Sequence, residues 1–185
     1  MKYEITNETH SICPNLRHIR ALKDFSDVKK GDLGGFIESE DNLSHEGDCW
    51  VYRDAEVYGN AEVHGNSIVS GKAAVFRNAV VSGNAEVSGY AKVFGNAKVS
   101  GNAEVYGYAH VFVNAEISDK AAVFHNAKVS GNARLSGNAE VSGNAVVSER
   151  AKVSGDAKVF QNAWVYGNAV VSDNTEIFGN AEISK

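Results

Sequence analysis

We predict an all-β fold, a single-stranded parallel β-helix, from three observations on this sequence of 185 residues. A pattern of six residues repeats without interruption from near Asp41 to Lys185. An aliphatic residue occupies every sixth position from Val51 to Ile183, and a small residue, usually Ala, stands two positions before it. Gly and Asn usually follow, two and three positions after the aliphatic residue. A fixed short period of this kind is typical of a solenoid.

Each hexad predicts one short strand and one corner. Residues two apart point to the same side of a strand, so the small and the aliphatic residue both face inward. The aliphatic positions hold 19 Val, three Ile and one Leu, and β-branched residues together with repeated Gly disfavour helices. Asn occupies 15 of the 22 corners from Asp54 to Asn180, and we expect it to take the positive φ of the turn, aided by the adjacent Gly.

Three hexads form one triangular coil, so residues 41–185 predict about eight coils and a column roughly 38 Å long at about 4.8 Å per strand layer. The repeat resembles the hexapeptide-repeat proteins, whose unit has an aliphatic residue and then a small one four positions later, as in Val57 and Ala61. This resemblance implies that the β-helix is left-handed. The segment from Asp24 to Val51 also resembles the head of uncharacterised phage-borne and enterobacterial members of that family.

Residues 1–40 lie outside the repeat and predict a small N-terminal β cap, followed by the β-helix at residues 41–185. Residues 2–6 and 17–22 alternate enough to be strands, whereas residues 32–35 are typical of a turn. A terminal coil exposes unpaired backbone groups and apolar side chains, so it needs a cover. The residues expected to close the N-terminal end are Phe25, Phe36, Ile37 and Leu43.

The repeat continues to Ile183, and we hypothesise that a second copy covers the C-terminal coil, end to end. Light scattering that shows a compact monomer at all concentrations would exclude this arrangement.

Sorting the outward residues by their place in the coil gives three faces. The basic face, around Val57, Val75 and Val93, carries consecutive aromatic residues beside a column of basic ones. The acidic face, around Val51 and Val69, combines aromatic residues, Trp50 among them, with four glutamates. The serine face carries a row of serines beside Lys98, Glu116, Arg134 and Lys152.

The basic face is the predicted binding and oligomer surface. A thin core of Val and Ala leaves no room for rings, so they must lie outside, where they either shield one another or form a contact surface. A basic and an acidic face on one column favour side-by-side association through heterologous contacts that close into a ring. The resemblance implies a trimer. The residues of this surface are Tyr58, Phe76, Phe94, Phe112, Lys92, His110, Lys128, Trp164 and Tyr166.

The resemblance also implies a possible activity, acyl transfer, in which a histidine is the general base and coenzyme A lies between columns. His110, between Lys92 and Lys128 in successive coils, is the best catalytic or anion-binding candidate. His45 falls in the inward aliphatic column and is expected to be structural. Against an enzyme stands the absence of insertions among the hexads, since long loops usually hold substrate contacts.

A metal site is disfavoured because His64, His110 and His125 fall on different faces or corners. The net charge of −5 argues against a nucleic-acid clamp. No apolar run approaches a membrane span and the start lacks a secretory layout, so with two unpatterned cysteines we expect a cytoplasmic protein.

Two functions follow from these observations. The first is a non-catalytic oligomeric scaffold or binding protein, of phage origin by the second resemblance, that binds a partner protein or a small anionic ligand and needs no cofactor. The alternative is an acyltransferase-like enzyme that uses His110 and coenzyme A between subunits.

Overall fold

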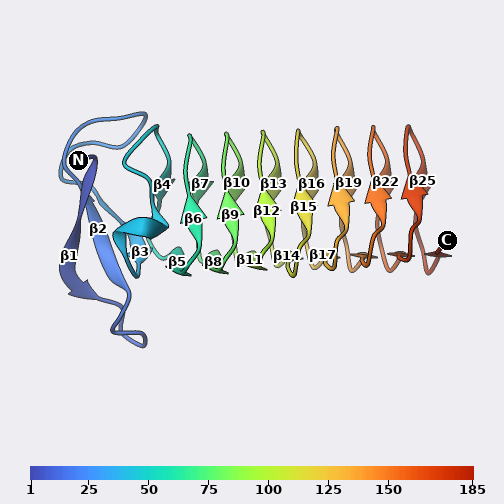
Figure 1. Cartoon of the computed structure of the whole chain (residues 1–185), viewed down its shortest axis with the longest axis horizontal. Coiled ribbons are helices and arrows are strands. Elements are labelled where there is room, and N and C mark those ends of the chain that lie inside the picture. Colours follow the sequence, from blue (N-terminus) through green and yellow to red (C-terminus); the bar gives the residue numbers. More distant parts are fainter.

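The computed structural model describes residues 1–185 as a straight column of stacked coils with extra strands at its N-terminal end (Figure 1). Every regular element is a β-strand except one short 3-10 helix, η1 (Glu40–Asn42). None of the helical structure has the length or the apolar character needed to cross a membrane. The prediction of an all-β solenoid of about eight coils is confirmed.

Each of the three predicted faces forms one sheet. The sheet of the basic face contains β1 (Tyr3–Thr9), β2 (Arg17–Ala21), β3 (Leu33–Ile37), β5 (Glu56–Gly59), β8 (Ala74–Arg77), β11 (Lys92–Gly95), β14 (His110–Val111), β17 (Lys128–Val129), β20 (Val146–Val147), β23 (Trp164–Val165) and β26 (Glu182–Ile183). The sheet of the acidic face contains β4 (Trp50–Val51), β7 (Ile68–Val69), β10 (Glu86–Val87), β13 (Glu104–Val105), β16 (Ala122–Val123), β19 (Glu140–Val141), β22 (Lys158–Val159) and β25 (Glu176–Ile177). The sheet of the serine face contains β6 (Glu62–Val63), β9 (Val80–Val81), β12 (Lys98–Val99), β15 (Glu116–Ile117), β18 (Arg134–Leu135), β21 (Lys152–Val153) and β24 (Val170–Val171).

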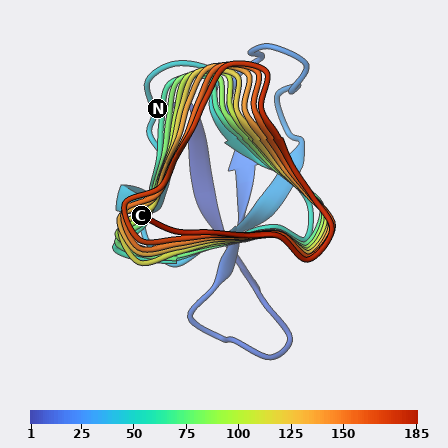
Figure 2. The ribbon, with the colours of Figure 1, turned by 90° about the vertical axis from the view of Figure 1, so that its right-hand side faces the viewer.

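The coils wind in the left-handed sense. Seen from the C-terminal end, the chain runs clockwise around the triangular cross-section as it approaches the viewer (Figure 2). Each strand pairs in parallel with the strand one coil later, so that Val93 lies beside Val111 and Val111 beside Val129. Backbone hydrogen bonds join the coils, as where the N–H of Ser70 donates to the carbonyl of Val87 at 2.9 Å. The left-handed winding that the resemblance implied is therefore present.

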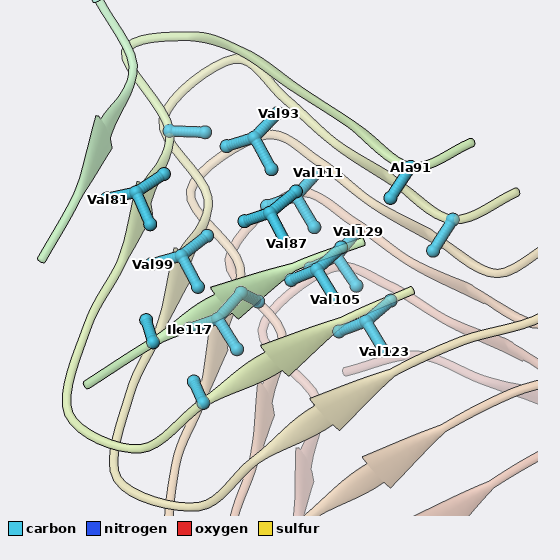
Figure 3. Packing of buried hydrophobic residues seen from close by; sticks show 14 of the residues in the cluster. Val81, Val87, Ala91, Val93, Val99, Val105, Val111, Ile117, Val123 and Val129 are labelled. Atoms are coloured by element: carbon cyan, nitrogen blue, oxygen red, sulfur yellow. The ribbon is translucent and has the colours of Figure 1, made fainter. Parts of the chain in front are cut away.

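The core is a column of Val and Ala with one layer per coil (Figure 3). Val87, Val93 and Val99, which belong to the three sheets, have no exposed surface, and neither has Ala91 between them. Because inward side chains are small and aligned, identical residues stack on identical residues, and the apolar area of each coil is buried by its neighbours.

The expectation that Asn takes the positive φ at the corners is wrong. Positive φ falls on the glycine position, not on Asn: Gly101 has φ +70°, and Asn102 beside it is not among the residues with positive φ. A Cβ on Gly101 would lie 2.8–3.1 Å from backbone atoms of Asp119 in the next coil, so glycine is favoured there by conformation and by space. The Asn side chains bond to one another instead, as in the row Asn60, Asn78, Asn96, Asn114 and Asn132.

The N-terminal residues extend the sheet of the basic face and cover the first coils. β1 pairs antiparallel with β2, β2 antiparallel with β3, and β3 parallel with β5. Tyr3, Ile19 and Val28 join the same apolar core as the solenoid. Between β1 and β2 the chain projects beyond the triangular cross-section on the side of the basic face (Figure 2).

The turn predicted at residues 32–35 is wrong, because Gly34 and Gly35 lie inside β3. A Cβ on Gly34 would stand 2.6 Å from side-chain atoms of Ile19 and Trp50, and one on Gly35 would stand 2.5 Å from the carbonyl oxygen of Ala55. These glycines therefore permit close approach of the cap to the first coil, which a sequence cannot distinguish from turn chemistry.

The coil that contains β3 departs from the strict period. Ile37 pairs with Val57 and Leu43 with Val63, two residues more than the regular spacing, and both side chains are fully buried. Leu43 thus fills the aliphatic column where His45 was expected. Parallel stacking begins at β3, and the predicted division at residues 40 and 41 stays a prediction.

Candidate functional site

The outward residues of the basic face are aligned by strand pairing. Lys92 of β11 is the partner of His110 of β14, which is the partner of Lys128 of β17. Successive positions are therefore one strand spacing apart, about 4.8 Å. The sequence repeat alone dictates this column, because residues separated by one coil occupy the same place on the same sheet.

Four aromatic rings form a continuous stack beside that column. Ring centroids lie 5.0 Å apart for Tyr58 and Phe76, 4.9 Å for Phe76 and Phe94, and 5.1 Å for Phe94 and Phe112. The rings are within 4–6° of parallel, and each is only partly exposed. The guanidinium of Arg77 lies 5.8 Å from the ring centroid of Phe94, so a cation also contacts the stack.

Trp164 and Tyr166 were predicted for the same surface but lie apart from this stack. They belong to β23 and the turn after it, and β17 and β20 separate β23 from β14. Their rings are 5.1 Å apart, and the indole N–H of Trp164 donates to the hydroxyl of Ser148 at 3.4 Å. The basic face therefore carries two aromatic groups, a four-ring stack and a smaller pair near the C-terminal end.

The surroundings of His110 favour the neutral form of its imidazole. Burial lowers its pKa below the usual 6.5, and the charges of Lys92 and Lys128 lower it further. Its ring meets Phe94 edge-on at 6.4 Å and takes part in no ion pair. A neutral imidazole can accept a proton, but no carboxylate orients this one, which is a poor arrangement for a general base.

The acidic face has a complementary layout. Glu86 of β10 and Glu104 of β13 are direct partners in the parallel ladder, so two like charges lie side by side. The rings of Tyr106 and Phe124 stack at 4.9 Å, and those of Phe160 and Phe178 at 5.4 Å.

The expectation that every ring of the acidic face is exposed is wrong for Trp50. The N-terminal cap covers it to 1 % exposure, with Phe25 at 5.3 Å and Tyr3 at 6.2 Å between ring centroids. The hydroxyl of the neighbouring Tyr52 donates to Asp27, and burial, together with that bond, raises the pKa of Tyr52.

A second polar cluster lies beneath the cap, and sequence reasoning missed its main member. Lys2 is 1 % exposed and its ammonium lies 3.2 Å from the sulfur of Cys49, which is also buried. His45 stacks on Tyr3 at 4.3 Å, accepts the backbone N–H of Lys2 at its Nδ1, and has a buried Nε2 without a hydrogen-bond partner. Nothing in the repeat signals that a lysine at position 2 would be drawn into the core.

His10 and His18 both pack against the ring of Phe36, at 4.7 and 3.9 Å between centroids, whereas His64 and His125 lie elsewhere. His64 follows β6 on the serine face, and His125 occupies a corner with φ +59°. No group of three or more His, Cys, Asp and Glu residues in the structure is arranged to hold a metal ion.

Comparison with known proteins identifies the repeat. A family profile described as "YdcK Beta solenoid repeat" matches residues 133–149, which run from the residue before β18 to just past β20. Over 37 residues the chain is 51% identical to the "Uncharacterized acetyltransferase YdcK" of Escherichia coli (strain K12). The chain thus contains a β-solenoid repeat similar to that of YdcK. The aligned segment covers 20% of this chain and 11% of the relative, and the acetyltransferase description belongs to the relative.

Proposed function

We propose that this β-solenoid protein is a non-catalytic, homo-oligomeric scaffold or binding protein whose basic face is the contact surface between copies. The observation behind the proposal is the stack from Tyr58 to Phe112, four partly exposed rings in register on one sheet. Contiguous apolar surface on the outside of a protein usually marks an interaction site, and aromatic residues contribute strongly to interfaces.

The charges on the two faces support a contact in which the basic face of one copy packs against the acidic face of the next. Within one chain, Lys92, His110 and Lys128 form one column and Glu86 and Glu104 another, and no ion pair joins the two columns. Glu86 and Glu104 are like charges in direct cross-strand positions, which destabilise a sheet, so the acidic column gains from the positive charges of a neighbouring copy.

The two columns also match in height. Glu86 precedes Lys92 by six residues, one third of a coil, which places them within about 2 Å of the same height along the axis. Glu104 and His110 have the same relation one coil later. Copies that stand side by side without an axial shift would therefore set Lys92 against Glu86 and His110 against Glu104. We propose that this contact repeats between three copies and closes a ring.

Charge reversal tests this contact. Lys92→Glu and Glu86→Lys should each lower the mass of the native assembly measured by analytical ultracentrifugation, and the double variant should restore it. Lys98→Glu on the serine face makes the same charge change and should leave the assembly intact. A wild-type monomer, or an assembly that all four variants leave unchanged, would contradict the proposal.

The same surface suits a small anionic ligand or an acidic segment of a partner protein. Two ammonium groups flank the neutral His110 along β11, β14 and β17, and a ring would enclose them between columns. We further propose end-to-end contact at the last coil, where Ile177 and Ile183 are partly exposed. Mass spectrometry of the native assembly purified from the cytoplasm, the proposed compartment, would report both the number of copies and any bound molecule.

A second candidate is an acyltransferase, favoured by one observation, the description of the relative as an acetyltransferase. Here the neutral imidazole of His110 would take a proton from the acceptor amine or hydroxyl while coenzyme A lies between subunits. Because a ligand stabilises the state that binds it, coenzyme A should then raise the thermal unfolding midpoint, and His110→Ala should abolish that rise. The scaffold proposal expects no response to coenzyme A in either protein.

A further inference from the structure

Lys2 is a buried amine without an acidic partner. Its Nζ donates to the carbonyl oxygens of Cys49 and Gly47 at 2.8 and 3.3 Å, and it lies 5.3 Å from the ring centroid of Phe25. The remaining contact is the Cys49 sulfur at 3.2 Å. An ammonium is costly to bury, so these contacts define a specific pocket for it rather than an accidental burial.

Cys49 stands where most coils place Ala, in the small-residue position two before Val51. Its side chain is fully buried, and its sulfur contacts the carbonyl oxygens of Ser44 at 3.4 Å and Val63 at 3.5 Å. The fold needs only a small side chain here, as 20 alanines at equivalent positions show. The thiol is therefore not required for packing, and what distinguishes it is the amine beside it.

Solvent comes close to this pair. An open hollow of about 500 Å³ is lined by residues that include Ser44, Glu46, Gly47 and Val63. The backbone carbonyls of these residues contact either the Cys49 sulfur or the Lys2 ammonium. The backbone of these residues thus lies between the hollow and the pair. A molecule as small as hydrogen peroxide can cross it when the structure opens locally.

We infer that Lys2 and Cys49 form an oxidative modification site at which hydrogen peroxide produces a covalent nitrogen–sulfur bond between Nζ and Sγ. In the first step the Cys49 sulfur attacks one peroxide oxygen, giving a sulfenic acid, and the second oxygen leaves as water. In the second step the Lys2 ammonium first loses one proton to solvent, and the neutral amine Nζ then attacks the sulfur. The S–OH bond breaks, and the hydroxyl takes a second proton from the nitrogen and leaves as water. The sulfur is oxidised, the peroxide is reduced, and the pair loses two hydrogen atoms in all.

The geometry favours the second step over further oxidation of the sulfur. The two reacting atoms already lie 3.2 Å apart, within the range of near-attack geometry. Both are buried, so water competes poorly for the sulfenic acid. Burial raises the pKa of the Cys49 thiol while Lys2 opposes that rise, and because the thiolate is the reactive form, the reaction should become faster as pH increases.

The product would fasten β1 to β4, since it joins residue 2 to the residue just before Trp50. The N-terminal strand closes this end of the column, so its detachment is a natural first step of unfolding. A bond across residues 2–49 would block that step. We therefore expect the oxidised protein to show a higher thermal unfolding midpoint and slower proteolysis near the N-terminus, both reversed by dithiothreitol.

The experiment uses the full chain with Cys13→Ser, which leaves Cys49 as its one thiol. After treatment with hydrogen peroxide, intact mass spectrometry should show a loss of about 2 Da, and peptide mapping should show residues 2 and 49 joined. Adding Lys2→Arg keeps the positive charge but removes the nucleophile, so this variant should instead accumulate a sulfenic acid that dimedone labels. Adding Cys49→Ala restores the usual residue of the repeat and should abolish both products in a folded protein.

Two results would overturn the inference. One is gain of oxygen at Cys49 at equal rates with Lys2 and with Arg at position 2. The other is a loss of about 2 Da that occurs equally in guanidinium chloride, where the folded geometry is absent.

Discussion

Phe76 and Phe94 stack with their ring centroids 4.9 Å apart and their planes 4° from parallel, because they are aligned partners in the neighbouring parallel strands β8 and β11. The spacing of the rings equals the spacing of the strands, so the backbone ladder sets the geometry and the rings follow. Each stacked pair adds about 0.5–1.5 kcal/mol beyond the area it buries. The stack therefore stabilises the column and at the same time presents a rigid surface.

Replacing Phe94 with Ser removes two stacked pairs, with Phe76 and with Phe112. We expect the free energy of unfolding to fall by about 1–3 kcal/mol in urea denaturation at fixed protein concentration. The double change Phe94→Ser and Phe112→Ser should also break the assembly in sedimentation velocity. Tyr108→Ser, which removes one stacked pair at a corner, should cost stability while leaving the assembled mass unchanged. An unchanged mass for the Phe94 and Phe112 variant would argue against the basic face as the contact surface.

Val113 is a β-branched residue with φ +67°, at a corner position that most coils fill with Gly. The left-handed conformation costs a residue with a Cβ about 1–2 kcal/mol, and Val113 is 46% exposed, so its burial offsets only part of that cost. Val113→Gly should therefore raise the free energy of unfolding by about 1 kcal/mol in a urea melt. Val113→Ala, which keeps the Cβ, should gain less. A destabilised Val113→Gly protein would show that the Val side chain makes a contact, as in an assembly.

Asn96 lies in the middle of a row of amide hydrogen bonds. Its Oδ1 accepts from Asn78 at 3.0 Å and its Nδ2 donates to Asn114 at 2.9 Å. Because a typical intramolecular hydrogen bond contributes about 0.5–1.5 kcal/mol, Asn96→Ala, which removes two, should lower the free energy of unfolding by about 1–2 kcal/mol. Asn168→Ala, at a corner where the amide makes one long contact of 3.5 Å, is the control and should have a smaller effect. Equal effects at both corners would assign the preference for Asn to the turn itself.

The repeat determined most of the fold. Once Val and the small residue two before it are known to point inward, the number of coils, the three sheets and the outward position of Phe76, Phe94 and Phe112 follow from periodicity. The corners show where that reasoning fails: Gly and Asn are adjacent, both tolerate positive φ, and only the structure shows that Gly101 takes it while Asn102 joins a row of amides. The N-terminal segment has no period, so the strand that contains Gly34 and the burial of Trp50 depend on tertiary contacts invisible in the sequence.

The candidate site was predictable in part, for the same reason. Aligned positions such as Lys92, His110 and Lys128 are fixed by the repeat, and strand pairing places them in one column. The pair of Lys2 and Cys49 was not predictable, because residue 2 reaches the thiol only through the antiparallel pairing of β1 and β2.

His110 predicts a pH dependence whose sign follows from its lowered pKa. Between the folded pKa and the ordinary value of 6.5, the unfolded chain binds a proton that the native state does not, so its contribution to stability falls as pH falls through this window. Above 6.5 the residue is neutral in both states and the penalty is absent. We expect wild-type protein to lose more stability between pH 7 and pH 5 than His110→Gln, measured by urea denaturation at each pH.

Lys92→Gln removes one of the charges that lower the pKa of His110, so an NMR titration of the His110 ring should show its pKa rising toward 6.5, whereas Lys98→Gln on the serine face should leave it unchanged. If Lys92→Gln does not change the pKa of His110, burial alone keeps this imidazole neutral. The charges in the column of Lys92, His110 and Lys128 would then no longer support it as an anion-binding surface.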